Sequence, residues 1–183
     1  MNRKKAFSSF VVMSMLFSFV GCGQQIAVSD DIQNTNTAFE QTTTLEDVIK
    51  IKEELTFPIG NEINSHSFVG TAYIAQMIPN DKIYHFPQTN NITFAPGARS
   101  SWHSHGGMVI LVTGGVGYYQ EGKVAQIIRK GDVVECPEGA KHWHGGSANT
   151  SFAHIAVNTN TELTGLEWFD RISEQEYQQL PTE

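Results

Sequence analysis

Two stretches of the sequence decide the fold: GARSSWHSH at residues 97–105 and GDVVECPEGAKHWH at residues 131–144. Each stretch begins with a glycine and ends with two histidines that are one residue apart. Alternate residues of a β-strand point to the same face of a sheet, so each His-x-His pair can direct both imidazoles at one point. Two such pairs on neighbouring strands could close a site for a divalent transition metal.

The sequence around these stretches predicts an all-β fold with a single core. Short apolar or alternating segments recur roughly every eight to twelve residues, and turn residues separate them. This spacing predicts a sandwich or barrel, with a tight bend at the glycines of residues 114–117. Short helices are expected outside the barrel, over residues 44–55 and 173–180. The expected strands cover residues 68–77, 91–94, 108–112, 118–120, 124–129, 133–136 and 152–157.

The composition excludes several classes of protein. Of the 183 residues, 40% are hydrophobic and 17% are charged, which excludes a wholly disordered chain and a coiled coil. The formal net charge of −7 argues against a nucleic-acid partner. Two cysteines are too few for a disulfide framework or a cysteine-rich zinc site. We expect Cys136 to be a small core residue rather than a nucleophile.

The first 43 residues predict export and a membrane anchor. A basic start at residues 3–5 precedes an apolar run at 6–20, which is shorter than the ~20 residues that a membrane-spanning helix needs. The run ends in FVGC at residues 19–22, which resembles a bacterial lipoprotein signal, and a plain secretory signal is the alternative. We expect the lipid on Cys22 and a location on the periplasmic or outer side of a bacterial cell-envelope membrane. The expected units are a signal peptide (1–21), a flexible tether (22–43) and one domain (44–183) with its barrel core at about 57–167.

The two histidine stretches are similar to the two motifs of the cupin superfamily. The first reads Gly, five residues, His-x-His, and the second reads Gly, five residues, Pro, one residue, Gly, two residues, His. The chain most resembles small single-domain cupins, which include metal-dependent hydroxynitrile lyases and partners of carboxymuconolactone decarboxylase-like proteins. The resemblance implies a jelly-roll β-barrel that binds Mn, Fe, Ni or Zn through His103, His105 and His142. The segments that resemble this group of small cupins are WHSH (102–105), GYYQ (117–120), GDVV (131–134) and HWHG (142–145).

One position departs from the cupin pattern. Cupins usually supply a fourth ligand, Glu or in this subgroup Gln, about four residues after the second histidine, where this chain has Val109. If the turn is one residue shorter, Met108 aligns with the missing Gln, but a thioether is a poor ligand for Mn²⁺ or Fe²⁺. We therefore expect a three-histidine site with water in the open positions, or a site with His144 as the fourth ligand.

Two further histidines are the expected catalytic residues. His144 shares the inward face of its strand with His142, and His154 matches a pocket histidine of the hydroxynitrile-lyase-like cupins. An imidazole titrates near neutrality, so either side chain could move a proton. His154 could instead be a core histidine, because apolar residues surround it in the sequence.

These residues favour an enzyme that acts on a small organic molecule inside the barrel. The leading hypothesis is a lyase of the hydroxynitrile-lyase type, or an isomerase, with the metal as Lewis acid. An Fe-dependent dioxygenase is one alternative, and a non-catalytic, membrane-tethered module that binds a small ligand or a metal is the other. We expect a homodimer with a small-molecule substrate and no nucleic-acid partner.

The lipid anchor is testable by fatty-acid labelling. We predict that the full chain, expressed in a bacterium with an alkyne-tagged fatty acid, takes up the label, because the lipoprotein resemblance implies that Cys22 is acylated. The acyl chains would supply ~0.8 kcal/mol of membrane affinity per buried CH₂ group. Label in a gel is compared between the wild type and Cys22→Ser, which should lose it. Cys136→Ser is the matched control and should label like the wild type. Label that persists in Cys22→Ser contradicts the prediction.

Overall fold

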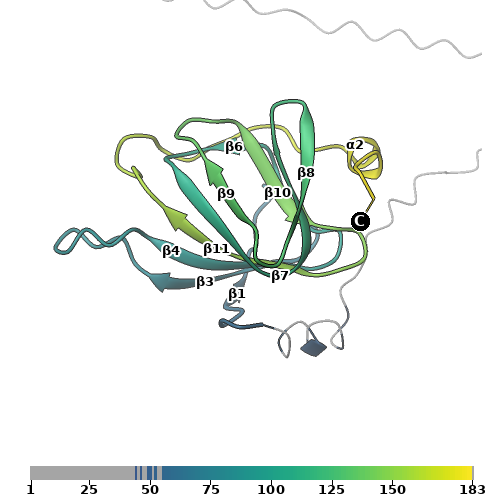
Figure 1. Cartoon of the computed structure of the whole chain (residues 1–183), viewed down its shortest axis with the longest axis horizontal. Coiled ribbons are helices and arrows are strands. Elements are labelled where there is room, and N and C mark those ends of the chain that lie inside the picture. The colour runs from purple at the N-terminus through teal and green to yellow at the C-terminus, as the bar shows by residue number, and fades with distance from the viewer. Residues whose placement is uncertain (1–43, 45, 47–48, 51, 53–54, 183) are drawn as a thin grey trace, which may run out of the picture. The chain divides into compact units, whose positions relative to one another are not determined.

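Figure 1 shows a computed structural model of the chain, which describes residues 44, 46, 49, 50, 52 and 55–182. The predicted signal peptide, the tether and part of the predicted helix over 44–55 lie outside these residues, although residues 46, 49, 50 and 52 are helical. Every described residue belongs to one compact unit of the chain. No helix in the described part of the chain is long and apolar enough to cross a membrane.

Antiparallel strands are the main secondary structure of this unit, as the sequence predicts for an all-β jelly-roll. Every predicted strand segment contains strand residues, although 68–77 divides at residues 70–71 into two strands, and the predicted C-terminal helix is α2 (Glu174–Gln178). The strands are β1 (Asn61–Glu62), β2 (Phe68–Val69), β3 (Ala72–Ile78), β4 (Thr89–Phe94), β5 (Arg99–Ser100), β6 (His103–Ser104), β7 (Met108–Glu121), β8 (Val124–Arg129), β9 (Val133–Cys136), β10 (His142–Gly146), β11 (Phe152–Asn158) and β12 (Glu167–Trp168).

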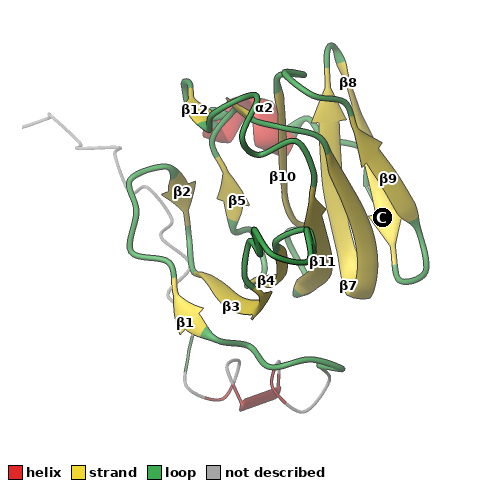
Figure 2. Ribbon diagram, turned by 90° about the vertical axis from the view of Figure 1, so that its left-hand side faces the viewer, coloured by secondary structure: helices red, strands yellow, loops and turns green. Residues whose placement is uncertain are grey.

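The strands form two sheets that share β7. In one sheet the order is β1-β3-β4-β11-β7, and β9 pairs with the same end of β7. In the other sheet β2, β5 and β10 follow one another, as Figure 2 shows, and the far end of β7 joins β10 to β8. The short strand β6 pairs with β10 on one side and with β12 on the other. This curled pair of sheets is the jelly-roll barrel.

The glycines of residues 114–117 do not end a strand, which corrects the bend expected from the sequence. Strand β7 continues through them and passes from one sheet into the other. The register against β11 shifts by one residue between Ala153 and His154, which marks a β-bulge, and bulges bend a strand without ending it. Gly115 has a φ of 69°, and a Cβ there would lie 1.6 Å from the carbonyl oxygen of Ser151. Pairing with β11 up to Gly115 and with β8 from Val116 carries the strand through the glycines, and glycine permits the positive φ and the close approach.

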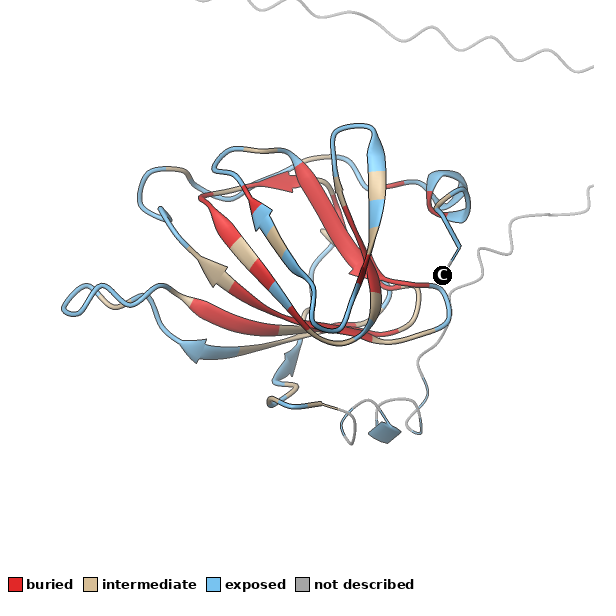
Figure 3. Ribbon diagram, in the orientation of Figure 1, coloured by how far each residue is buried: buried red, intermediate tan, exposed pale blue. Residues whose placement is uncertain are grey.

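The hydrophobic core fills the space between the sheets. Figure 3 shows β4 and β10 as mostly buried, whereas buried and more exposed residues alternate along the first part of β7. Cys136 is buried among these residues, as predicted, and burial raises the pKa of its thiol to about 11. The thiol therefore stays protonated near neutral pH. The core residues are Ala72, Phe94, Ala95, Ala98, Met108, Ile110, Val112, Tyr119, Ile128, Cys136, Phe152 and Ala156.

Helix α2 packs on the outside of the barrel and covers the outer face of β10. Its N-terminus has a capping box, because the Ser173 hydroxyl accepts from the backbone of Glu176 and the Glu176 carboxylate accepts from the backbone of Ser173. A second apolar cluster lies beneath the helix and contains Trp143, which points away from the barrel interior as its strand parity predicts. The buried members of that cluster are Tyr118, Trp143, Ile172 and Tyr177.

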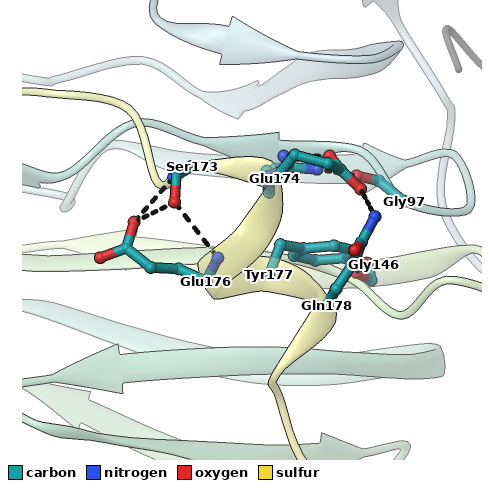
Figure 4. Close-up of polar contacts among 8 residues, drawn as sticks. Gly97, Gly146, Ser173, Glu174, Glu176, Tyr177 and Gln178 are labelled. Atoms are coloured by element: carbon teal, nitrogen blue, oxygen red, sulfur yellow. Dashed lines mark hydrogen bonds and ion pairs between the residues drawn. The ribbon is translucent and has the colours of Figure 1, made fainter. Parts of the chain in front are cut away.

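Figure 4 shows the capping box of Ser173 and Glu176, and a buried arginine near this end of the helix clamps it to the barrel. Arg99 donates to the carboxylate of Glu174 over 2.9 Å and to the carbonyl oxygen of Gly97 over 3.1 Å. Its guanidinium also lies 4.2 Å from the ring centroid of Tyr177, whose hydroxyl donates to the Gly146 carbonyl over 2.6 Å. The strand β10 is consequently buried on both faces.

The clamp predicts a measurable loss of stability. Arg99→Met should lower the free energy of unfolding by about 2 kcal/mol, because it removes charge-assisted hydrogen bonds and a cation–π contact from a buried position. Glu174→Gln should cost less than about 1 kcal/mol, since the Glu174 side chain is 64% exposed and exposed ion pairs contribute little. Urea unfolding of both variants measures the difference. Equal losses for the two variants would contradict this account.

Candidate metal centre

The three histidines that the sequence predicts as ligands come together inside the barrel. Strand β6 carries His103, and His105 follows it; His142 begins β10, which pairs with β6 so that His142 lies opposite His103. One donor atom from each histidine lies within 4.8 Å of the other two. His103 and His142 are buried, and His105 is partly exposed. The three donors therefore form a group that could hold a metal ion.

Backbone carbonyl groups orient all three rings. Nδ1 of His103 lies 2.9 Å from the carbonyl oxygen of Ser101, and Nδ1 of His142 lies 2.9 Å from that of Ala140. Nδ1 of His105 is bonded in the same way to the next residue, Gly106. A carbonyl oxygen only accepts, so each Nδ1 carries the hydrogen and each Nε2 keeps a free lone pair. Metal-binding histidines are typically held in this way through the nitrogen that does not bind the metal.

The lone pair on Nε2 of His142 has no partner among the described residues. This atom is buried and finds no hydrogen-bond donor among the residues that the structure describes. A buried polar atom without a partner costs on the order of 1–3 kcal/mol. Because a divalent metal accepts such a lone pair, the donor set fits the metal that the sequence predicts.

Burial favours the neutral form of two of the three rings, those of His103 and His142. Burial, and then the neighbouring His142, lowers the pKa of His103 to about 3. Burial likewise lowers the pKa of His142 to about 4. Neutral imidazole is the form that binds metal, so near pH 7 these two rings need lose no proton on binding.

The described residues bring together three donors and no fourth one. Of the His, Cys, Asp and Glu donors in the described residues, His103, His105 and His142 form the one group close enough to share an ion. Met108, which aligns with the absent Gln, is buried in the hydrophobic core cluster. His144 lies next to the group, with its ring centroid 5.3 Å from that of His103. Three ligands with open positions are typical of catalytic rather than structural metal sites.

The two predicted catalytic histidines, His144 and His154, form a hydrogen-bonded pair beside this group. Nε2 of His154 lies 3.3 Å from Nδ1 of His144, and both side chains are buried. Burial lowers the pKa of His144 well below its ordinary value and the pKa of His154 to about 4. Two neutral rings share such a bond when one nitrogen donates its hydrogen and the other accepts it.

Other residues of the site have little signal in the sequence. Of the two neighbouring tyrosines, Tyr119 faces the histidines, and Tyr118 packs against Trp143 outside. The Tyr119 hydroxyl donates to Glu121 over 3.0 Å and is also hydrogen-bonded to the Cys136 thiol. Strand parity shows that one tyrosine must face inward, but not which one. The sequence gives no sign of Trp168, whose ring centroid lies 4.9 Å from that of His103. Its strand has only two residues, too few to show a periodic pattern.

The comparison with known proteins identifies the family. The cupin domain family matches residues 90–157, which contain both histidine motifs. The (R)-mandelonitrile lyase of Granulicella tundricola is 37% identical over 89 residues, which are 48% of this chain and 68% of that protein. The chain belongs to the cupin family, as the sequence motifs predict.

Solved structures agree with this assignment. A cupin-like protein from Thermotoga maritima superposes with a TM-score of 0.65 and is 38% identical, over 68% of this chain and 95% of that one. A structure of DMSP lyases superposes with a TM-score of 0.50 at 10% identity, over 61% of this chain and 63% of that one. At that identity the second likeness shows the fold alone.

The geometry predicts one divalent metal per chain. Metal-stripped protein titrated with Mn²⁺, Fe²⁺, Ni²⁺ or Zn²⁺ should take up one equivalent of at least one of them. The His142→Gln variant should bind that metal at least about 100-fold more weakly, since loss of an outer partner alone costs about 10–100-fold. His66→Gln, an exposed histidine outside the group, is the control and should bind like the wild type. A wild-type chain that takes up none of the four metals would contradict the prediction.

Proposed function

We propose that this cupin is a metal-dependent lyase that splits a small cyanohydrin into a carbonyl compound and hydrogen cyanide. The observation that carries the proposal is the hydrogen-bonded pair His144–His154 beside the three-histidine group. A divalent metal held by that group supplies Lewis-acid chemistry, because it polarises a hydroxyl or carbonyl oxygen. The 37% identity with a mandelonitrile lyase supports the same reaction class.

We assign the proton transfer to His144. Its Nδ1 faces His154, so its Nε2 is the ring nitrogen left to meet a substrate. In the tautomer that suits this role, Nδ1–H of His144 donates to Nε2 of His154, and Nε2 of His144 has the free lone pair. The ring of His144 lies 5.3 Å from that of His103, which places the base next to the proposed ligands. His154 is a positioning residue, because it fixes the orientation of the His144 ring.

In the proposed reaction His144 is the one group that accepts and returns the proton. The hydroxyl proton of the cyanohydrin moves to Nε2 of His144, and the O–H electron pair forms the carbonyl bond. The bond between the carbinol carbon and the nitrile carbon breaks, and its electrons leave with cyanide. Cyanide then takes the proton from Nε2 of His144 and departs as hydrogen cyanide, so His144 returns to its first state.

An iron-dependent dioxygenase is the second candidate. The donors that group in the described residues are three histidines without a carboxylate, which leaves positions for O₂ and for a substrate. The two reactions differ in their need for oxygen, because cyanohydrin cleavage consumes none. A non-catalytic module would differ from both, since it would bind a ligand without turnover.

The lyase is tested by the release of benzaldehyde and cyanide from mandelonitrile. Metal-loaded protein should turn over equally in air and under argon. His144→Ala should lower kcat by about 10²–10⁴-fold, the usual contribution of a general acid–base group, with its bound metal unchanged. His154→Ala should lower kcat less, because the base itself remains.

Controls separate the candidate functions. His66→Ala should match the wild type, since His66 is exposed and lies outside the site. Loaded protein that releases no cyanide from mandelonitrile or from an aliphatic cyanohydrin would overturn the lyase. O₂ consumption by the iron-loaded protein in place of cyanide release would identify a dioxygenase.

A further inference from the structure

Trp168 stands directly across from a proposed metal ligand. Strand β12 pairs with β6, and Trp168 is the register partner of His103. Directly opposed residues of an antiparallel pair project from the same face of the sheet, so both side chains face the three-histidine group. Their ring centroids are 4.9 Å apart. Figure 2 shows β12 at one end of the barrel, outside the segment 90–157 that the cupin family matches.

A row of aromatic rings continues from Trp168 into the barrel. The Trp168 ring centroid lies 5.6 Å from that of Phe68, in an edge-to-face arrangement, and Phe68 lies 6.2 Å from Phe94. Phe94 in turn lies 5.5 Å from His144, the proposed base. One side of the site is therefore lined with aromatic rings from its exposed edge to the buried histidine pair.

The exposed edge of this row is apolar and held in place. Trp168 is 37% exposed, and Leu166 in the loop before it is 58% exposed. The carboxylate of Glu138 fixes that loop, because it accepts from Nδ2 of Asn160 and from the hydroxyl of Thr164. Since Glu138 belongs to the turn that precedes His142, the loop is tied to the segment that carries a proposed ligand. The half-exposed indole is consequently presented in a fixed position beside the donor group.

We propose that Trp168 is a specificity-determining residue, whose indole selects substrates with an aromatic ring next to the hydroxyl-bearing carbon. The proposal rests on the proposed function and names the substrate class for that site. An aromatic ring gains from aromatic neighbours at centroid distances of 4.5–7 Å, the range in which the rings of this row already lie. A neutral ring suits the place better than a cation does, because a metal held by three neutral histidines leaves the site positively charged.

The test measures binding rather than turnover. The probes are benzyl alcohol and cyclohexylmethanol, which have similar size and the same hydroxymethyl group, and only the first is aromatic. Calorimetry on the metal-loaded full chain gives the ratio of their dissociation constants for the wild type, Trp168→Leu, Trp168→Phe and the control Trp102→Phe. Metal content is measured in each sample.

The wild type should bind benzyl alcohol more tightly than cyclohexylmethanol. Trp168→Leu should reduce this preference by between about twofold and tenfold, with metal content unchanged, because it keeps apolar area and loses the aromatic face. Trp168→Phe should retain most of the preference, and Trp102→Phe should retain all of it. If Trp168→Leu leaves the preference for benzyl alcohol unchanged, the proposal is overturned, whether or not the variant retains its metal.

The result is independent of the reaction. The two alcohols are not cleaved, so a failure to release cyanide from mandelonitrile would overturn the lyase and leave the aromatic preference standing. If the lyase is active, Trp168→Leu should raise KM for mandelonitrile more than for an aliphatic cyanohydrin and change kcat little. A role confined to supporting His103 would instead lower kcat and metal content for both substrates.

Discussion

The hydrogen bonds between three imidazoles and three backbone carbonyl groups are the constraint on which the site depends. They place the hydrogen of each ligand ring on Nδ1, and so leave Nε2 as a lone pair on each ring. The acceptors belong to Ser101, Gly106 and Ala140, each within two residues of its histidine. The path of the backbone therefore fixes the orientation of the rings, and no other side chain is required. Pairing of β6 with β10 brings two of these short segments together.

The same interior carries an energetic cost. Four buried histidines in the barrel take positions that aliphatic side chains could fill, and a buried polar group stabilises the fold only when it is paired. His144 and His154 share one hydrogen bond, whereas Nε2 of His142 has no partner in the described residues. Because this nitrogen belongs to a group of three donors that could share an ion, a ligand that supplies the missing interaction best explains the arrangement.

Much of this fold and part of the site follow from local patterns in the sequence. Alternation and turn residues locate the strands, because these signals depend on neighbouring residues only. The grouping of the histidines follows from motif spacing. The course of β7 does not follow, since glycine indicates a turn, whereas tertiary pairing with β11 and then with β8 carries the strand through the glycines. The position of Trp168 cannot be predicted for a similar reason. A strand of two residues has no hydrophobic period, and the place of β12 depends on its pairing with β6.

The burial of β10 on both faces links the outside of the molecule to its interior. One face of this strand carries His142 and His144, and the other carries Trp143 beneath α2. Undocking of the helix would expose Trp143 at a free-energy cost below that of global unfolding, so hydrogen exchange at the β10 amides would report on the helix. Coupling between two events on one strand is reciprocal. A ligand that binds inside the barrel and stiffens β10 would therefore slow the undocking of α2. The dynamics of the outer helix would then depend on whether the interior is occupied.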